Sequence, residues 1–207
     1  VQENISAEYF SRGWHNMVVF NNKLWIIAGE TVDQNGDTVL LDDCWSSSDG
    51  ISWQAGSSIV SFSPRKMAVA TVINGKLRLW GGYGQNLNGQ TGALNDAWST
   101  TNGETWLLES STSPFGSRCG AGYVFYNDRI WITGGASSPV AFGATYYNDI
   151  WASNDGLNWV EIAKNAEGTA QHFSPRGFHQ LSALNGRIYL SGGEQETGLL
   201  NEVWLSQ

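Results

Sequence analysis

Residues 118–159 read RCGAGYVFYNDRIWITGGASSPVAFGATYYNDIWASNDGLNW, and the anchors of this stretch recur throughout the chain. The anchors are an arginine, a glycine doublet, an acid-x-Trp step and a closing tryptophan: Arg118, Gly134-Gly135, Asp149 to Trp151, and Trp159. The same anchors, in the same order, stand before and after this stretch, although the last copy lacks the closing tryptophan. A repeated unit of this kind determines the whole architecture.

The spacing of the anchors is nearly constant. The tryptophan of the acid-x-Trp step stands at Trp45, Trp98, Trp151 and Trp204, at intervals of 53, 53 and 53 residues. The arginines are 53, 53 and 58 residues apart: Arg12, Arg65, Arg118 and Arg176. The last interval is five residues longer, and the loop after the fourth doublet is five residues shorter. The distance from the doublet to the acid is 9 residues there, from Gly193 to Glu202, and 14 residues in the two preceding units. The length changes therefore fall in loops, and the strands keep their places.

Each unit predicts four antiparallel strands. A β-rich run such as 69–72 precedes a two-residue turn, Asn74-Gly75, and the next strand runs into the glycine doublet. Asn, Asp and Gly tolerate the positive φ of a type I′ turn, so these dipeptides indicate tight hairpins. The doublet suits a place where backbones come too close for a Cβ. No helical periodicity competes with this pattern.

Four strands in about 53 residues, repeated, predict an all-β fold, a β-propeller of four four-stranded blades. We expect a single domain over 1–207, with blades at about 12–55, 65–109, 118–162 and 176–207 plus 1–5.

The pattern resembles the kelch repeat over essentially the whole chain. The resemblance rests on Arg-x-x-His at the first strand, the doublet after the second and the tryptophan of the fourth, as in Arg12 to His15 through Trp53. The first doublet departs from the pattern as Ala28-Gly29, and the middle units carry Ala68 and Ala121 where the histidine would stand. Residues 48–53 are similar to a shortened Asp-box hairpin. The resemblance implies a propeller, and kelch propellers commonly have six or seven blades.

The ends of the chain are out of phase with the unit. Residues Val1 to Ile5 stand in the register of a fourth strand, whereas the last unit has only three strands of its own. We expect this N-terminal strand to complete the last blade, since closure removes exposed sheet edges. Three assemblies are consistent with this phase: a self-closed ring of four blades, part of a larger ring, or half of a strand-exchanged dimer.

Composition excludes some classes of function. The net charge is −8 and charged residues make up 14% of the chain, which excludes a basic surface for nucleic acid. No apolar run is long enough for membrane insertion. The low charge favours an extracellular, periplasmic or cell-surface setting. Cys44 and Cys119 fall at different positions of the unit, and we expect two unpaired, mostly buried thiols.

The repeated arginines are the first candidate ligand-binding residues. Arg12, Arg65, Arg118 and Arg176 could ring one mouth of the channel and bind a carboxylate or an acidic sugar. The alternative is a structural ion pair between each arginine and the acidic residue of a blade, and one acid per unit favours this alternative.

Metal sites have weak support in the sequence. Asp33, Asn35 and Asp37 look like part of a calcium loop, but they lack its full pattern, and Asn35-Gly36 is an ordinary turn. His15 and His179 share one position of the unit and are better interpreted as hydrogen-bonded strand residues. We expect no cofactor.

Aromatic residues that differ between units are better candidates for ligand contact, because repeat proteins place function where the copies vary. These candidates are Trp14, Tyr83, Tyr123 and Phe178, with Trp80 as a further one. No catalytic motif appears. The sequence favours a non-catalytic propeller that recognises a protein or glycan ligand through loops at one face. The alternatives are a sugar-acid-processing enzyme and a structural module that assembles into a homo-oligomer by strand exchange.

Overall fold

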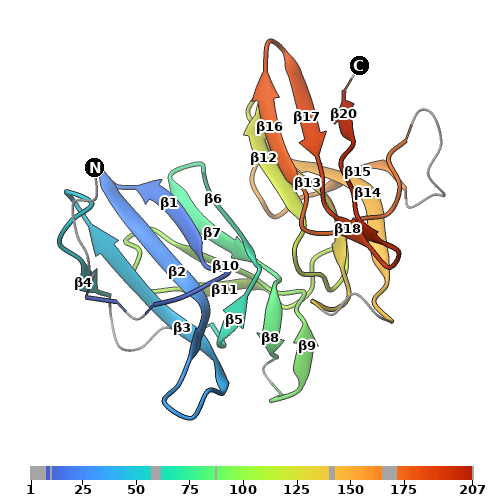
Figure 1. Ribbon diagram of the computed structural model, residues 1–207. Helices are drawn as coiled ribbons and strands as arrows, with labels where there is room; N and C mark the ends of the chain where they lie inside the picture. Colours follow the sequence, from blue (N-terminus) through green and yellow to red (C-terminus); the bar gives the residue numbers. More distant parts are fainter. Residues whose placement is uncertain are drawn as a thin grey trace.

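The computed structural model describes residues 8–9, 11–56, 62–86, 88–139, 143–164 and 172–206. Over these residues the chain forms twenty short strands, all paired antiparallel (Figure 1). In this part of the chain no helix is long and apolar enough to cross a membrane. The all-β fold expected from the repeat is therefore confirmed.

Four main sheets follow the four units, and each is a propeller blade. Blade 1 contains β1 (Asn16–Phe20), β2 (Lys23–Val32), β3 (Thr38–Ser47) and β4 (Gln54–Ala55). Blade 2 contains β6 (Val69–Ile73), β7 (Lys76–Trp80), β10 (Ala97–Thr100) and β11 (Leu107–Ser110). Blade 3 contains β12 (Gly122–Tyr126), β13 (Arg129–Ala136), β14 (Tyr146–Ser153) and β15 (Val160–Ala163). Blade 4 contains β16 (Gln180–Leu184), β17 (Arg187–Ser191) and β20 (Val203–Leu205).

Smaller sheets extend the blades at one end. One contains β5 (Arg65–Lys66), β8 (Tyr83–Gln85) and β9 (Thr91–Ala93), and the other contains β18 (Glu194–Gln195) and β19 (Gly198–Leu199). In blade 1 the long strands β2 and β3 continue into the same region. These hairpins all project from the lower end of the blades in Figure 1. We call this end the hairpin face.

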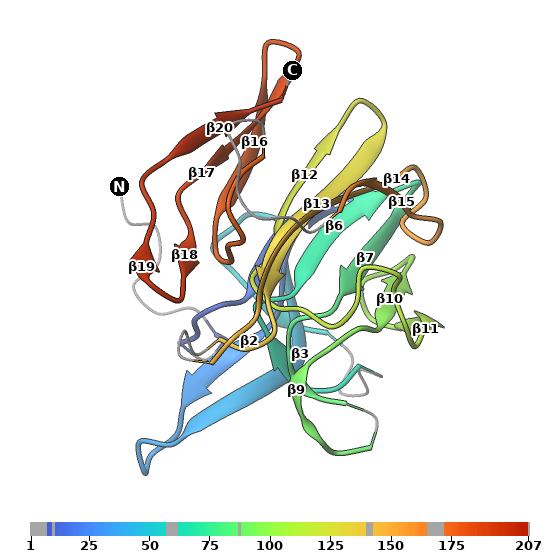
Figure 2. The same ribbon diagram turned by 90° about the vertical axis from the view of Figure 1, so that its right-hand side faces the viewer.

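The blades pack in chain order. The first strand of each blade contacts that of the next, β1 with β6, β6 with β12 and β12 with β16, and Figure 2 shows the sheets side by side in this sequence. Three blades have the four strands predicted, and blade 4 has three strands among the described residues. The strand expected at Val1 to Ile5 lies outside the described residues.

The first hairpin of every blade is the tight turn that the sequence predicts. Its two central residues have positive φ in all four blades, as at Asn74 (51°) and Gly75 (71°), or Asn127 (53°) and Asp128 (57°). Two positive φ values in succession define the type I′ turn, which matches the twist of the flanking strands. The residues that separate the first two strands therefore fix their register.

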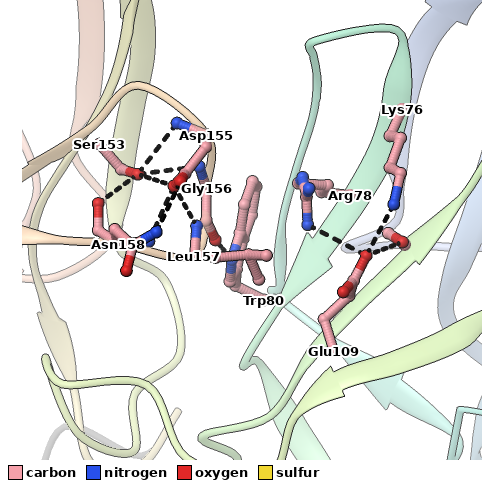
Figure 3. Close-up of polar contacts among 10 residues, drawn as sticks. Lys76, Arg78, Trp80, Glu109, Ser153, Asp155, Gly156, Leu157 and Asn158 are labelled. Atoms are coloured by element: carbon pink, nitrogen blue, oxygen red, sulfur yellow. Dashed lines mark hydrogen bonds and ion pairs between the residues drawn. The ribbon is translucent and has the colours of Figure 1, made fainter.

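The second hairpin is held by a side chain that binds its backbone (Figure 3). In blade 3, Asp155 Oδ1 accepts hydrogen bonds from the N–H groups of Leu157 and Asn158, both at 2.8 Å. The carbonyl of Gly156 accepts one from the indole of Trp80, at 3.0 Å, so the hairpin contacts the preceding blade. In blade 1 the N–H groups of Ile51 and Ser52 make the corresponding hydrogen bonds to Asp49, and these bonds lower the pKa of Asp49 to about 2.

The glycine doublets lie where two chain segments cross. The second glycine of the doublet has a φ of +108°, +96°, +101° and +99° in the four blades, and at Gly82 a Cβ would stand 2.7 Å from the carbonyl oxygen of Lys66. Both the conformation and the space exclude a side chain. Ala28 takes the first position of the doublet in blade 1, with a φ of 57°.

The hydrophobic core lies between the blades. Blades 1 and 2 enclose Trp25, Ile27, Leu79 and Trp106, and blades 2 and 3 enclose a second cluster around Trp80 and Ile132. A third, smaller cluster lies between blades 3 and 4. Cys44 and Cys119 are both buried and unpaired, as expected.

The doublet gives a matched test of the fold. Replacing Gly82 by Ala should lower the free energy of unfolding by about 2 kcal/mol or more, because the positive φ and the contact with Lys66 both oppose a Cβ. The control is Gly92→Ala, where a Cβ would meet nothing within 4 Å. Urea unfolding of both variants checks this, and equal stabilities would contradict it.

Candidate functional site

The arginine of each unit lies inside its blade, in contact with the acid-x-Trp step. In blade 2, Arg65 binds both carboxylate oxygens of Asp96, at 2.6 and 2.8 Å, and also the carbonyl of Gly81 at 3.0 Å. The indole N–H of Trp98 donates to the same carboxylate at 2.7 Å. The guanidinium is 0% exposed. The acid therefore holds the segment before the first strand to the beginning of the third strand.

The other blades repeat this arrangement. Arg12 binds Asp43 and Arg118 binds Asp149, each through two oxygens at 2.6 to 2.9 Å. Blade 4 has a weaker version, in which Arg176 reaches one oxygen of Glu202 at 2.5 Å and the carboxylate is 47% exposed. These contacts are the structural ion pairs that the sequence suggested as the alternative to a ligand site. All four arginine side chains are at most 4% exposed.

An aromatic residue three positions before each arginine completes the cluster, and sequence reasoning missed it. These residues are Tyr9, Phe62, Phe115 and Phe173, with the guanidinium carbon 5.4 to 5.8 Å from the ring centroid. In blades 1 to 3 the same ring also meets the closing tryptophan edge-on, at 5.2, 5.2 and 5.0 Å between centroids. The constant offset from the arginine is the signal that could have found them.

The buried pairs predict a steep dependence of stability on the arginine. Replacing Arg65 by Met should cost about 3–5 kcal/mol in urea unfolding, because Asp96 is left charged and unpaired. Arg176→Met should cost less, because the half-exposed Glu202 is solvated by water. The double variant Arg65→Met with Asp96→Leu should recover part of the loss. A stability loss equal to the sum of the losses of the two single variants would contradict the pairing.

The residues two positions after the arginines form a series across the four blades, which we call the inner ring. The ring consists of Trp14, Met67, Gly120 and Phe178, whose φ values are 56°, 57°, 60° and 59°. The N–H groups of Met67, Gly120 and Phe178 each donate to the carbonyl of the corresponding residue in the preceding blade, at 3.0, 3.0 and 2.7 Å. Left-handed backbone is unfavourable for bulky side chains, so these contacts stabilise a strained conformation.

Two large aromatic rings of this inner ring meet each other. Trp14 and Phe178, from blades 1 and 4, have centroids 6.2 Å apart and planes tilted by 59°. Trp14 is 55% exposed. An exposed indole held in a strained backbone is a costly feature for a surface that only meets solvent, and it makes this pair the strongest contact candidate in the described residues.

Carboxylates and a phenol flank this pair. Gly13 is bridged to Glu30 and Gly177 to Glu194, so a glutamate stands beside each aromatic residue. Glu30 pairs with Lys66 of the next blade at 2.6 Å, and Glu194 accepts from the hydroxyl of Tyr146 at 3.2 Å. Burial is the main cause, and the negative charge of Glu194 the second, that raises the pKa of the Tyr146 hydroxyl to about 12. The aromatic pair and its two glutamates form what we call the central platform.

The other sequence candidates lie in different surroundings. Tyr83, in β8, is the cross-strand partner of Lys66, which forms the ion pair with Glu30. Tyr123, in β12, packs against the cluster between blades 2 and 3. Trp80 is 1% exposed and belongs to that core, so the expectation that it contacts a ligand is wrong.

The loop of Asp33, Asn35 and Asp37 is a hydrogen-bonded turn. Asp33 Oδ1 accepts from the N–H groups of Asn35 and Asp37, at 2.8 and 2.9 Å, which lowers the pKa of Asp33. Asn86, which stands 53 residues later, makes the same two bonds at 2.9 and 3.0 Å. An amide serves equally well there, so the role of the carboxylate is to cap a turn. In the described residues no three His, Cys, Asp or Glu side chains come together to hold a metal ion.

Of the two histidines at the Arg-x-x-His step, His179 has a structural contact. His179 is 2% exposed, and its Nε2 lies 2.7 Å from the hydroxyl of Thr133 in blade 3. Burial, with Arg176 as a second cause, lowers the pKa of His179 to about 3. Burial lowers the pKa of His15 as well. The side chain of His179 thus joins blades 3 and 4 in its neutral form.

This neutral histidine makes stability depend on pH. Between about pH 6.5 and 5 the unfolded chain takes up a proton at residue 179 and the folded protein does not, so the unfolding free energy falls as the pH falls. The expected slope from this group is up to about 1.4 kcal/mol per pH unit. His179→Gln should remove that slope, whereas Thr133→Val should keep it because the imidazole stays buried. Urea unfolding across this range measures both, and an unchanged slope in His179→Gln would refute the assignment.

A comparison with known families decides what this arrangement is. A family model described as the KLHDC2/KLHL20/DRC7 Kelch-repeats domain matches residues 6–193. The chain belongs to this kelch family. The kelch resemblance of the repeat is thereby confirmed. A solved kelch-type relative, described as the structure of YjhT, superposes with a TM-score of 0.65 at 14% identity, over 94% of this chain and 81% of that one. At this identity the likeness concerns the fold alone.

Curated relatives of this kelch chain match over shorter stretches. N-acetylneuraminate epimerase of Haemophilus influenzae (strain PittEE) is 29% identical over 100 residues, which is 48% of this chain and 26% of that protein. The enzyme of the same name from Escherichia coli O9:H4 (strain HS) is 31% identical over 113 residues, 50% and 29%. Tip elongation aberrant protein 3 of Schizosaccharomyces pombe is 26% identical over 127 residues, 48% and 11%. Less than a third of each relative's length is covered.

Proposed function

We propose that this kelch chain is a non-catalytic binding module that recognises a glycan or protein ligand at the central platform. The observation that carries the proposal is Trp14, a 55% exposed indole in left-handed backbone, beside Phe178. Flat aromatic surfaces give much contact area with little loss of side-chain freedom, which is why they dominate binding surfaces. The low charge of the chain supports an extracellular or periplasmic setting for this role.

The surroundings of the platform favour a glycan. Glu30 and Glu194 offer carboxylate oxygens to hydroxyl groups, and charge-assisted hydrogen bonds of this kind are short and strong. Glu30 belongs to the β2–β3 hairpin and Glu194 to the β18–β19 hairpin, so the platform includes residues of hairpins that differ in length between blades. A ring-shaped, hydroxyl-rich ligand would use both the aromatic faces and the carboxylates.

A glycan array, followed by titration of the best-binding glycan, tests the proposal. Trp14→Ala should weaken that binding by about 10-fold or more, since truncated aromatic anchors commonly cost over 1 kcal/mol. Thermal stability should change little, because the indole is largely exposed. Leu184→Ala is the matched control, since Leu184 is 60% exposed and lies at the end of β16, away from the hairpin face.

The outcomes separate the alternatives. If neither Trp14→Ala nor Phe178→Ala weakens glycan binding, the glycan does not bind at the central platform. Absence of glycan binding, together with capture of a peptide that depends on Trp14, would assign a protein ligand instead.

A sugar-acid-processing activity is the second candidate, and the relatives named N-acetylneuraminate epimerase favour it. The repeated arginines are already paired within the blades, so an incoming carboxylate would have to bind elsewhere. Incubation with N-acetylneuraminate, followed by NMR, distinguishes the two candidates. Turnover that depends on Glu30 or Glu194 would replace the binding module by an enzyme.

A further inference from the structure

The four units differ at two positions that meet at the central platform. The first is the inner-ring position, two residues after each arginine: Trp14, Met67, Gly120 and Phe178. The second is the residue that follows each glycine doublet: Glu30, Tyr83, Ala136 and Glu194. The units of blades 1 and 4 have a large aromatic ring at the first position, and the same two units have a glutamate at the second. An aromatic ring and a carboxylate therefore occur together in this chain.

The backbone brings each glutamate next to its aromatic residue. The residue before Trp14 exchanges two backbone hydrogen bonds with Glu30, at 2.9 and 3.0 Å. The residue before Phe178 exchanges the same two bonds with Glu194, at 3.0 and 2.9 Å. The contact between the rings of Trp14 and Phe178 joins the two sides. The platform thus has the same construction in blade 1 and in blade 4.

A third aromatic ring lies beside the platform on the blade 4 side. This ring belongs to Tyr146 and lies over Gly177, where a Cβ would stand 3.5 Å from Tyr146 Cε1. The hydroxyl of Tyr146 donates to Glu194 at 3.2 Å. Phe178 in turn lies over blade 3, where a Cβ on Gly120 would stand 2.4 Å from its ring. The glycine at the inner-ring position of blade 3 therefore leaves the space that the Phe178 ring fills.

The two glutamates differ in how their charge is balanced. Glu30 forms an ion pair with Lys66 at 2.6 Å. Glu194 accepts a hydrogen bond from the neutral hydroxyl of Tyr146, and none of the ion pairs in the described part of the chain includes Glu194. The blade 4 side of the platform thus presents aromatic rings beside a carboxylate that lacks a cation.

We propose that the ligand of the central platform is a glycan whose recognised residue is an amino sugar with a free ammonium group. This inference rests on the proposed function and names the chemistry of its ligand. The ammonium group binds the carboxylate of Glu194 and lies against the rings of Tyr146 and Phe178. Aromatic faces attract cations, and a hydrogen bond between two charged groups is stronger than one between neutral groups. The sugar ring packs its C–H groups on Trp14.

The blade 1 side of the platform favours a sugar over a lysine side chain as the source of the ammonium group. The pair of Glu30 and Lys66 offers both an acceptor and donors, and these side chains are 20% and 15% exposed. Sugar hydroxyl groups can use both, whereas a lysine side chain has no hydroxyl group. An acidic sugar is disfavoured, because its carboxylate would face Glu194 and like charges brought together are costly.

Two tetrasaccharides that differ only at nitrogen test the proposal. They are the linear tetramer of glucosamine and the same tetramer with every nitrogen acetylated, titrated in mildly acidic buffer in which the free amines are protonated. We expect the glucosamine tetramer to bind about 10-fold more tightly or better, because acetylation removes the charge that Glu194 recognises.

Two glutamate substitutions give the matched test. Glu194→Gln should weaken binding of the glucosamine tetramer by about 10-fold, so that the two tetramers bind within about 3-fold of each other. The glutamine can still accept from Tyr146, so the local structure is kept. Glu161→Gln removes the same charge from β15, at the edge of blade 3 opposite β12, and should leave the preference intact. Both variants change the net charge equally, so only a local contact distinguishes them.

The possible failures are distinguishable. Equal affinity for the two tetramers, with Trp14→Ala weakening both, would leave the proposed function in place and overturn the ammonium group. A preference for glucosamine that survives Glu194→Gln, or that Glu161→Gln reduces as much, would overturn the role of Glu194. A lysine-containing peptide that binds through Trp14 and Glu194, without binding of either tetramer, would overturn the amino sugar. Failure of both tetramers and of every arrayed glycan to bind would overturn glycan recognition itself.

Discussion

A buried guanidinium held by a carboxylate that also accepts an indole N–H is the interaction on which each blade depends. It joins the segment before the first strand to the beginning of the third strand and fixes the tryptophan in the core, so two of the four anchors of the repeat, the arginine and the acid-x-Trp step, belong to one contact. Removing one partner leaves a charge without water, which explains why the arginine, the acid and the tryptophan recur together. The arginines are therefore elements of the architecture, and the ligand surface has to be sought elsewhere.

Sequence reasoning predicted the features that local chemistry determines. The type I′ turns followed from dipeptides such as Asn74-Gly75, and the strand order followed from the constant spacing of the anchors. The glycine doublet was assigned to backbone crowding, and the contact at Gly82 has that cause. Each of these features depends on a few adjacent residues, so a single sequence reveals them.

Features that depend on how blades meet were harder to predict. Trp14 and Phe178 were candidates because they vary between units, but their contact joins residues 164 positions apart and depends on the inner ring of the blades. Trp80 was misjudged, because its burial comes from the hairpin of the following blade. The aromatic residue three positions before each arginine was overlooked although its spacing is regular, since it lies in a connector where no strand pattern draws attention to it.

The inner ring of left-handed residues also gives the molecule a direction. Each of its hydrogen bonds runs from an N–H in the later blade to a carbonyl in the earlier one, so the series of blades has a donor end at Trp14 and an acceptor end at Phe178. Two such series cannot join donor end to donor end through these groups. Any blade that extends this one, from whichever chain, has to join head to tail, and cyclic symmetry is the closed arrangement that such polarity permits.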